Sequence, residues 1–198
     1  LGYPVIFGGV ATTTGDKDIW GYQEEGEPGV GGTFTQINAD FTGDIGNRVF
    51  PFYFDYDGWF FIGAGQAQTT MYKTQDFLSF TSLGTLPTEL QNRAAATATV
   101  FKGKVYVACG SIATDYGTET MYTGHLYGDV WEYTPETNTW LRLINNDDRF
   151  KMFWANLIAN DRFMYLQKGH VRDTQIDQFP DGFVTGDQLG LLVTGNAL

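Results

Sequence analysis

Acidic side chains that fall between the hydrophobic runs are the first residues in this chain that could do chemistry. The candidates are Asp40, Asp44, Asp115, Asp147 and Asp148. Two carboxylates that face each other across a cleft are the catalytic pair of most glycosidases. A glycosidase is therefore one function that the sequence leaves open, because the separation of these residues is not readable from their positions.

Other catalytic chemistries have fewer residues to draw on. His125 and His170 are the two histidines and Cys109 is the single cysteine. A Ser/His/Asp hydrolase needs a nucleophile on a strained turn, and no nucleophile-elbow motif is present. Cys109 ends a hydrophobic run, which is typical of a small buried residue. We predict no catalytic residue and no cofactor.

Residues 38–44 place oxygen-bearing side chains on alternate residues before a glycine, Gly43, loosely like the start of a calcium-binding loop. The glutamate that closes such a loop with two oxygens is absent. Asn and Asp also form turns without an ion, because their side chains hydrogen-bond to the backbone two residues later. We therefore predict a turn here and no metal site.

The loop residues that we predict to bind a ligand combine aromatic rings with polar groups. They are Asp115, Tyr116, Tyr122, His125 and Tyr127, together with Asp40 and Asp44. Tyrosines of this kind stack on sugar rings or anchor protein contacts, although they could also serve only to pack the loop. The expected ligand is a glycan or a protein surface.

A repeat positions these loops. Similar segments recur at residues 33–37, 79–83 and 139–143, and other landmarks keep the same order. Those landmarks are Gly9, Gly65, Gly110 and Gly169, each ending a hydrophobic run, and Arg48, Arg93 and Arg149, each opening one. Intervals of roughly 45 to 60 residues are typical of a unit of four strands with variable loops.

The clearest unit predicts four antiparallel strands, at residues 94–101, 104–109, 129–133 and 139–144. Lys102-Gly103 is expected to form the first hairpin turn, and residues 134–138 a turn with proline. The unit before it predicts strands at residues 49–54, 59–62, 70–73 and 79–83 around a turn at Asp57-Gly58.

The two outer units are less regular. The first predicts strands at residues 5–7, 18–22 and 33–37 and lacks an opening strand, for which residues 189–198 are a candidate. The last predicts a hairpin at residues 150–158 and 162–167, then a poorer strand at 174–179. We interpret residues 1–198 as one domain, with units of approximately 1–46, 47–91, 92–148 and 149–198, either complete or part of a longer chain.

The segment from Gly128 to Trp140 resembles the kelch repeat, with Tyr133 and Trp140 at that repeat's separation. Phe7-Gly8-Gly9 carries its glycine doublet, while Phe34 and Phe80 stand where the family usually has tryptophan. The resemblance implies an all-β, kelch-like β-propeller or partial propeller of about four blades. Kelch-like proteins include interaction adaptors, galactose-oxidase-like enzymes and bacterial and phage surface proteins, so the fold assigns no function. A copper radical site would need paired Tyr and His ligands and a cysteine that forms a thioether, whereas His125 and His170 are the only histidines and Cys109 is expected to be internal.

Composition narrows the class of protein. Sixteen Phe, eleven Tyr, five Trp and 25 Gly with 18% charged residues are typical of many short strands. The net charge of −11 argues against nucleic acid as partner. No apolar run is long enough to span a membrane. We expect a recognition or structural module on a virion or cell surface, such as a phage tail or receptor-binding component, that assembles with other chains or with further parts of its own; a cytosolic kelch-type adaptor is the alternative.

Overall fold

The computed structural model describes residues 5–7, 18–24, 31–41, 45–46, 48–112, 126–152, 154–167 and 189–192. These residues are almost entirely β-structure. The strands are β1 (Val5–Phe7), β2 (Ile19–Glu24), β3 (Gly32–Asn38), β4 (Phe52–Tyr56), β5 (Trp59–Gly63), β6 (Thr70–Thr74), β7 (Thr81–Thr85), β8 (Arg93–Ala94), β9 (Thr97–Phe101), β10 (Lys104–Ala108), β11 (Ser111–Ile112), β12 (Val130–Thr134), β13 (Thr139–Ile144), β14 (Asn156–Ala159), β15 (Met164–Gln167) and β16 (Leu189–Leu192). Two short 3-10 helices, η1 (Thr88–Leu90) and η2 (Asp148–Phe150), lie between strands. The prediction of an all-β chain is confirmed.

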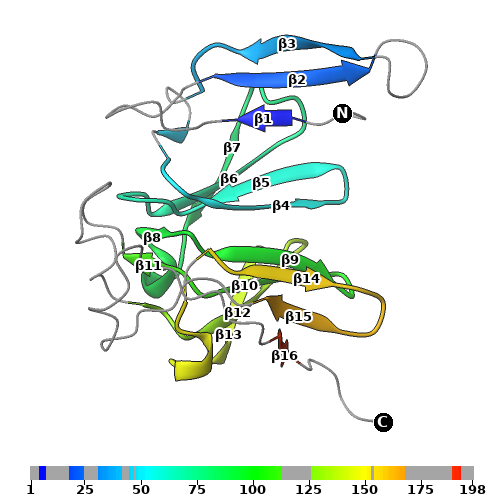
Figure 1. Ribbon diagram of the computed structural model, residues 1–198. Helices are drawn as coiled ribbons and strands as arrows, with labels where there is room; N and C mark the ends of the chain where they lie inside the picture. The colour runs from blue at the N-terminus through cyan, green and yellow to red at the C-terminus, as the bar shows by residue number, and fades with distance from the viewer. Residues whose placement is uncertain are drawn as a thin grey trace, which may run out of the picture.

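The strands form four main antiparallel sheets that follow the order of the chain. The second sheet, β4-β5-β6-β7, and the third, β9-β10-β12-β13, have four strands each. The first sheet, β1-β2-β3, and the fourth, β14-β15-β16, have three strands each among the described residues. A short pair, β8 with β11, lies beside the third sheet, and the sheets are stacked from β3 to β16 (Figure 1).

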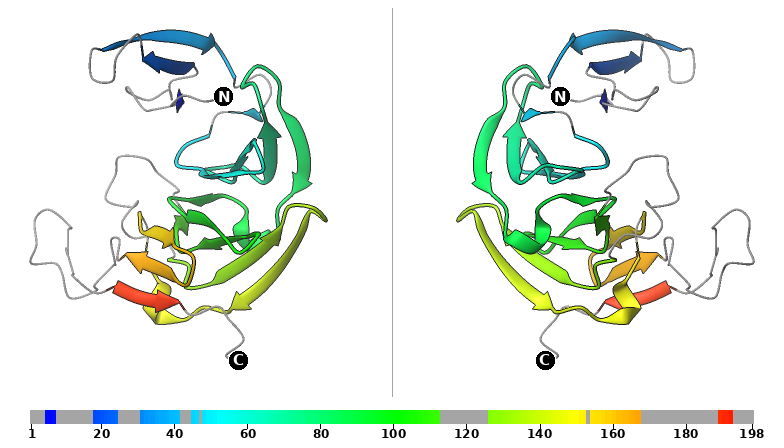
Figure 2. Two further views of the ribbon diagram at one scale, coloured as in Figure 1. Left: turned by 90° about the vertical axis from the view of Figure 1, so that its right-hand side faces the viewer. Right: turned by 90° about the vertical axis from the view of Figure 1, so that its left-hand side faces the viewer.

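The first strands of successive sheets are neighbours, with β9 in contact with both β4 and β14. The last strands β7 and β13 lie along the outer side of the stack (Figure 2). The sheets therefore fan out around their first strands. The described strands do not close into a ring.

Two tight turns set the hairpins that open the second and third sheets. Asp57 and Gly58 have φ of 48° and 73°, and Lys102 and Gly103 have φ of 49° and 74°. Positive φ at both central residues is the geometry of a type I′ turn, whose twist matches that of the flanking strands. The turns at these two predicted positions are confirmed.

Recurring backbone hydrogen bonds join each sheet to the next. The N–H of Gly65 donates to the carbonyl of Arg93 at 2.9 Å, and the N–H of Gly110 donates to that of Met152 at 2.7 Å. Phe50, Ala95 and Trp154 all have positive φ; the N–H of Ala95 donates to Phe50 at 2.9 Å, and that of Trp154 to Ala95 at 3.1 Å. The same contacts between successive sheets are the structural expression of the repeat.

Apolar side chains fill the spaces between the sheets. Ile19 and Ile62 belong to the core between the first and second sheets. Phe61 and Tyr133 belong to the core between the second and third. The third and fourth sheets enclose a core of residues that includes Tyr106, Met152 and Leu166. Each inner sheet is thus buried on both faces, as burial of apolar surface requires.

Two expectations about the outer sheets are corrected. Residues 189–192 do not pair with β1; as β16 they pair antiparallel with β15, with Met164 opposite Leu192. Arg149 does not repeat Arg48 and Arg93, because its side chain is 81% exposed in η2 and pairs with Asp147. The buried Met152 takes the repeat position instead. The predicted strand at residues 174–179 lies outside the described residues.

A pair of glycine substitutions tests the hydrogen-bonded contact between the third and fourth sheets at Gly110. Gly110 has φ of +100°, and a Cβ there would lie 2.9 Å from the carbonyl oxygen of Ala94. Gly103 also has positive φ, +74°, but nothing lies within 4 Å of its Cβ position. We expect Gly110→Ala to lower the free energy of unfolding by about 3 kcal/mol or more, and Gly103→Ala by only about 1 kcal/mol. Chemical denaturation measures both, and equal losses would contradict the close approach at Gly110.

Candidate functional site

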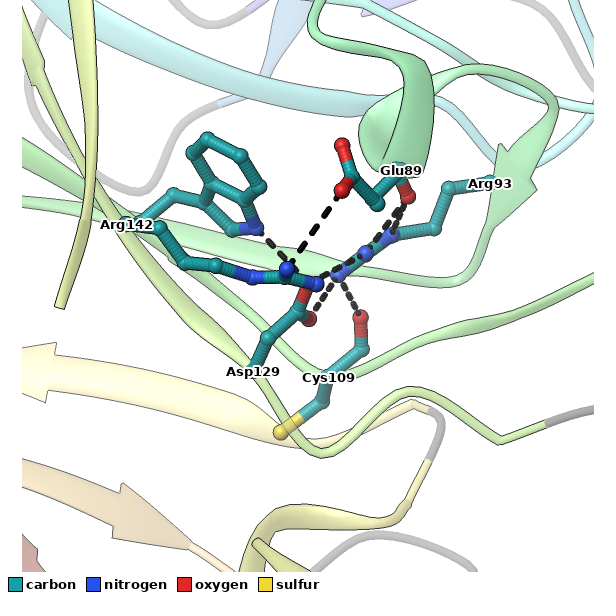
Figure 3. A network of polar contacts seen from close by, with 6 residues as sticks. Glu89, Arg93, Cys109, Asp129 and Arg142 are labelled. Carbon is teal, nitrogen blue, oxygen red and sulfur yellow. Dashed lines mark hydrogen bonds and ion pairs between the residues drawn. The ribbon is translucent and has the colours of Figure 1, made fainter. Parts of the chain in front are cut away.

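A buried ion pair lies where the chain enters the third sheet (Figure 3). Arg93 and Asp129 have side chains that are 0% and 1% exposed. Two parallel hydrogen bonds join them, from Nη1 to Oδ1 at 2.6 Å and from Nη2 to Oδ2 at 2.9 Å. This fork-to-fork geometry is the strongest form of a charged hydrogen bond, and it holds the start of β8 against the start of β12.

The remaining polar atoms of the pair also have partners. Arg93 donates to the carbonyls of Cys109 at 3.1 Å and Glu89 at 2.6 Å. Asp129 Oδ2 accepts from the indole of Trp131 at 2.7 Å and from Nη2 of Arg142 at 3.2 Å. We call Arg93, Asp129, Trp131, Arg142 and Glu89 the Arg93 cluster. Because its buried charges are paired and hydrogen-bonded, the cost of removing them from water is offset.

The rim of the Arg93 cluster reaches the surface. The side chains of Arg142 and Glu89 are 29% and 45% exposed, and Nη1 of Arg142 lies 3.4 Å from Oε1 of Glu89. Arg142 also stacks over the ring of Trp131, with 5.1 Å from Cζ to the ring centroid. Its Nε is buried and has no hydrogen-bond partner in the described part of the chain. The rim therefore presents one cation and one anion on a rigid support.

The second sheet has the same construction with a neutral partner. Arg48 donates to the carbonyl of Ala64 at 2.7 Å, as Arg93 does to Cys109, and both bonds span 16 residues. Its Nη2 donates to the hydroxyl of Thr70 at 2.9 Å. Met71 pairs with Gly63 and Val130 pairs with Ala108, so Thr70 occupies the place of Asp129. The arginine at the start of a unit is thus a structural repeat.

The two buried arginines, Arg48 and Arg93, differ in the charge of their surroundings. Burial lowers the pKa of Arg48 to about 10. Burial also acts to raise the pKa of Asp129, but hydrogen bonds and the charge of Arg93 outweigh it and hold that pKa below its usual value. Asp129 is therefore ionised at neutral pH and compensates Arg93, whereas the described partners of the Arg48 guanidinium are carbonyls, the Thr70 hydroxyl and the Tyr72 ring.

The chain segments on either side of residues 113–125 are joined to each other next to the Arg93 cluster. Leu126 forms an isolated bridge with Ser111, and the N–H of Tyr127 donates to the carbonyl of Gly110 at 3.0 Å. The Tyr127 ring covers the guanidinium of Arg93, with 3.8 Å from Cζ to the ring centroid. Burial raises the pKa of the Tyr127 hydroxyl. Residues 110–112 and 126–127, which flank residues 113–125 in the sequence, are thus held together beside a buried ion pair.

Only two of the predicted binding residues are among those described. Tyr127 is half-buried at the loop base, so it anchors the loop rather than standing free in it. Asp40 is exposed after β3, where its N–H donates to Asn38 Oδ1 at 3.0 Å. That bond, from a backbone N–H to a side chain two residues earlier, is the predicted turn geometry. Asn38 also donates to the carbonyl of Phe77 at 2.9 Å. Asp44, Asp115, Tyr116, Tyr122 and His125 lie outside the described residues.

The other candidate carboxylates have structural contacts. Asp147 accepts from the N–H and side chain of Arg149, which lowers its pKa to about 2. Asp148 pairs with Lys151 at 2.6 Å. A glycosidase acid needs a raised pKa, so Asp147 does not have the environment of that acid. Both carboxylates stabilise η2 and the turn that leads into the fourth sheet.

Cys109 is buried and free, as predicted, and burial raises its pKa to about 12. A thiol of this kind is unreactive at neutral pH. The described residues contain no group of three or more His, Cys, Asp or Glu side chains that could hold a metal ion. Among them there is also no helix long and apolar enough to cross a membrane.

Comparison with known proteins gives a likeness of fold only. No protein-family model matches the chain, and no curated protein matches it. A solved structure described as "Structure of YjhT" matches with 23% identity and a TM-score of 0.50, over 63% of this chain and 35% of that one. The likeness concerns the arrangement of strands. The matched part spans about a third of the length of YjhT.

Sequence reasoning missed the Arg93 cluster, although a signal was present. Asp18-Ile19-Trp20-Gly21-Tyr22 and Asp129-Val130-Trp131-Glu132-Tyr133 share an Asp-x-Trp-x-Tyr pattern at matching strands. Comparison of these two segments would have marked the aspartate and the tryptophan as a recurring pair, although the cation beside Asp129 has no signal in this pattern.

Loss of the Asp129 charge should leave Arg93 buried and uncompensated. We expect Asp129→Asn to lower the free energy of unfolding at pH 7 by about 3–5 kcal/mol. Because the folded pKa of Asp129 is depressed, the wild-type stabilisation is present above the unfolded pKa of about 3.9 and is lost as pH falls through the folded value. Urea denaturation from pH 7 to pH 3 should therefore show a flatter decline for the variant, and parallel curves would contradict the assignment.

The neutral partner of Arg48 offers the reverse experiment. Thr70→Asp places a carboxylate where Asp129 stands in the third sheet, and we expect about 1 kcal/mol of added stability at pH 7. Thr81→Asp, on the exposed strand β7, is the control and should change stability by less than about 0.5 kcal/mol. Thermal melts measure both variants. A destabilising Thr70→Asp would mean that the two arginine sites are not equivalent.

Proposed function

We propose that the chain is a non-catalytic recognition module, built as a kelch-like β-propeller or part of one, whose long loops bind a glycan or a protein surface. The observation that carries this proposal is the pair of joined segments on either side of residues 113–125. Tyr127 contacts Arg93 of the buried ion pair, and the bridge from Ser111 to Leu126 joins the two segments that flank these residues. Loops on a rigid scaffold are the usual location of binding residues.

The propeller interpretation draws support from the sheets themselves. The first strands β4, β9 and β14 are neighbours, and β7 and β13 lie on the outer side (Figure 2). A radial order of strands within antiparallel sheets is what propeller blades have. The kelch-like segment from Gly128 to Trp140 supplies β12, its turn and β13.

Electrostatics and composition favour an exposed setting for this module. The chain carries a net charge of −11 and many aromatic residues. An acidic surface with aromatic loops suits neutral sugars or basic protein patches better than polyanions. We propose a virion or cell-surface location, as in a receptor-binding component.

Binding measurements with loop variants test the proposal. Tyr116→Ala, Tyr122→Ala and His125→Ala remove the aromatic and imidazole groups of the loop, while Tyr53→Ala removes a tyrosine that is 57% exposed on β4. We expect a glycan array to identify a ligand, and calorimetry to give about tenfold weaker binding or more for the two loop tyrosine variants.

The Tyr53→Ala variant should bind like the wild type, because β4 lies outside the loops. Unchanged binding in all three loop variants would contradict recognition by residues 113–125. Equal loss in the Tyr53→Ala control would assign the ligand to a sheet surface instead. Hydrolysis of the bound glycan would favour the glycosidase alternative.

A further inference from the structure

The first sheet contains a copy of the Arg93 cluster from which the arginine is missing. In β2, Ile19 pairs with Phe7, and in β12, Val130 pairs with Ala108. Each pair lies at the same end of its hairpin, so Asp18 in the first sheet corresponds to Asp129 in the third. The correspondence follows from strand register and not from sequence likeness alone.

The hydrogen bonds around the two aspartates match. Trp20 donates its indole N–H to Asp18 Oδ2 at 2.7 Å, and Trp131 donates to Asp129 Oδ2 at 2.7 Å. On the neighbouring strand, Gln36 donates to Asp18 Oδ2 at 3.3 Å. Arg142 donates to Asp129 Oδ2 at 3.2 Å from the same position. The side chains of the first sheet are therefore already arranged as they are in the third.

One partner differs between the two sites. Asp129 receives two hydrogen bonds from Arg93, which precedes β9, the strand that pairs with β10. In the first sheet β1 corresponds to β10, and among the described residues β1 pairs only with β2. No cation contacts Asp18 in the described part of the chain. Among the residues that the structure describes, neither a strand in the place of β9 nor an arginine in the place of Arg93 lies at this edge.

The face of the first sheet that carries Trp20 is also uncovered. Trp20 and Phe34 are 36% and 52% exposed. The ring centroids of Phe34 and Tyr22 lie 4.9 Å apart. The corresponding face of the third sheet is buried, with Trp131 and Tyr133 7% and 0% exposed. There the second sheet covers it, with Phe54 at 6.1 Å from Tyr133 between ring centroids.

We propose that the free edge of β1 accepts an added β-strand whose arginine binds Asp18. The occupant is an extended segment with the chemistry of residues 88–101, in which Arg93 precedes β9. Addition of a strand to an open sheet edge gives affinity through main-chain hydrogen bonds, and side-chain contacts give specificity. Here Asp18 selects the arginine, and Trp20 and Gln36 hold Asp18 in place. The cover of the aromatic face comes with the unit to which the added strand belongs.

A synthetic peptide of residues 88–101 provides the direct probe. We expect saturable binding of this peptide to the full chain by calorimetry. Replacement of its arginine by glutamine, or Asp18→Asn in the chain, should weaken binding about tenfold or more, because either change removes a charged hydrogen-bonded pair. Asp55→Asn, at an exposed carboxylate on β4, is the matched control and should leave binding unchanged.

Several results would overturn the proposal. They are absence of binding at millimolar peptide, equal binding of the arginine and glutamine peptides, and full binding by Asp18→Asn. The two peptides probe the unaltered chain, so the comparison does not depend on how a variant folds. A concentration-dependent dimer that Phe34→Glu abolishes and the peptide leaves intact would assign the aromatic face to a second copy, and would also reject the added strand.

Discussion

The bidentate contact between Arg93 and Asp129 is the interaction on which the third sheet and its neighbours depend. It joins the segment that enters the sheet to the strand that returns from the long loop, and both charges are buried. A buried pair of this kind adds little net stability over apolar packing, but its loss leaves an uncompensated charge. The pair therefore specifies one arrangement of β8, β12 and Tyr127, because any other arrangement would leave a buried charge without its partner. The hydrogen bonds from Gly65 and Gly110 to the next sheet then propagate that arrangement along the stack.

Strand positions were predictable because they rest on local signals. The turns at Asp57-Gly58 and Lys102-Gly103 and the alternation of apolar residues are each contained within one hairpin. Contacts between distant segments were less readable. In the sequence, Arg149 looks like the arginine that opens the fourth unit. Its exposure, together with the burial of Met152 and the hydrogen bond from Gly110 to Met152, shows that Met152 holds the position of Arg93 in that unit. In the same way, the apolar run at residues 189–192 suits any open edge, and register alone assigns it to β15.

For the candidate site too, residue types could be read from the sequence, but contacts with distant residues could not. Residue types suggested that tyrosines and aspartates in long loops would bind a ligand, and Tyr127 illustrates why this is incomplete. Its ring is half-buried over Arg93 and supports the loop. Asp147 and Asp148 are likewise occupied by Arg149 and Lys151. Composition indicates which groups are available, but whether a group is anchored or available to a ligand depends on partners far away in the sequence.

The proposed loop recognition and the proposed strand addition concern separate parts of the molecule, since the bridge from Ser111 to Leu126 lies beside the third sheet and the edge of β1 belongs to the first (Figure 1). The same element, an aspartate followed by tryptophan and tyrosine on the third strand of a unit, underlies both. In the third sheet it is closed by Arg93 and becomes a rigid support. In the first sheet it keeps its tryptophan and glutamine contacts, and no described cation takes the place of Arg93 beside its carboxylate. A repeat fold can thus use one hydrogen-bonded unit as a brace inside the stack and as an acceptor at its end, because the chemistry of the unit does not change with position while its neighbours do.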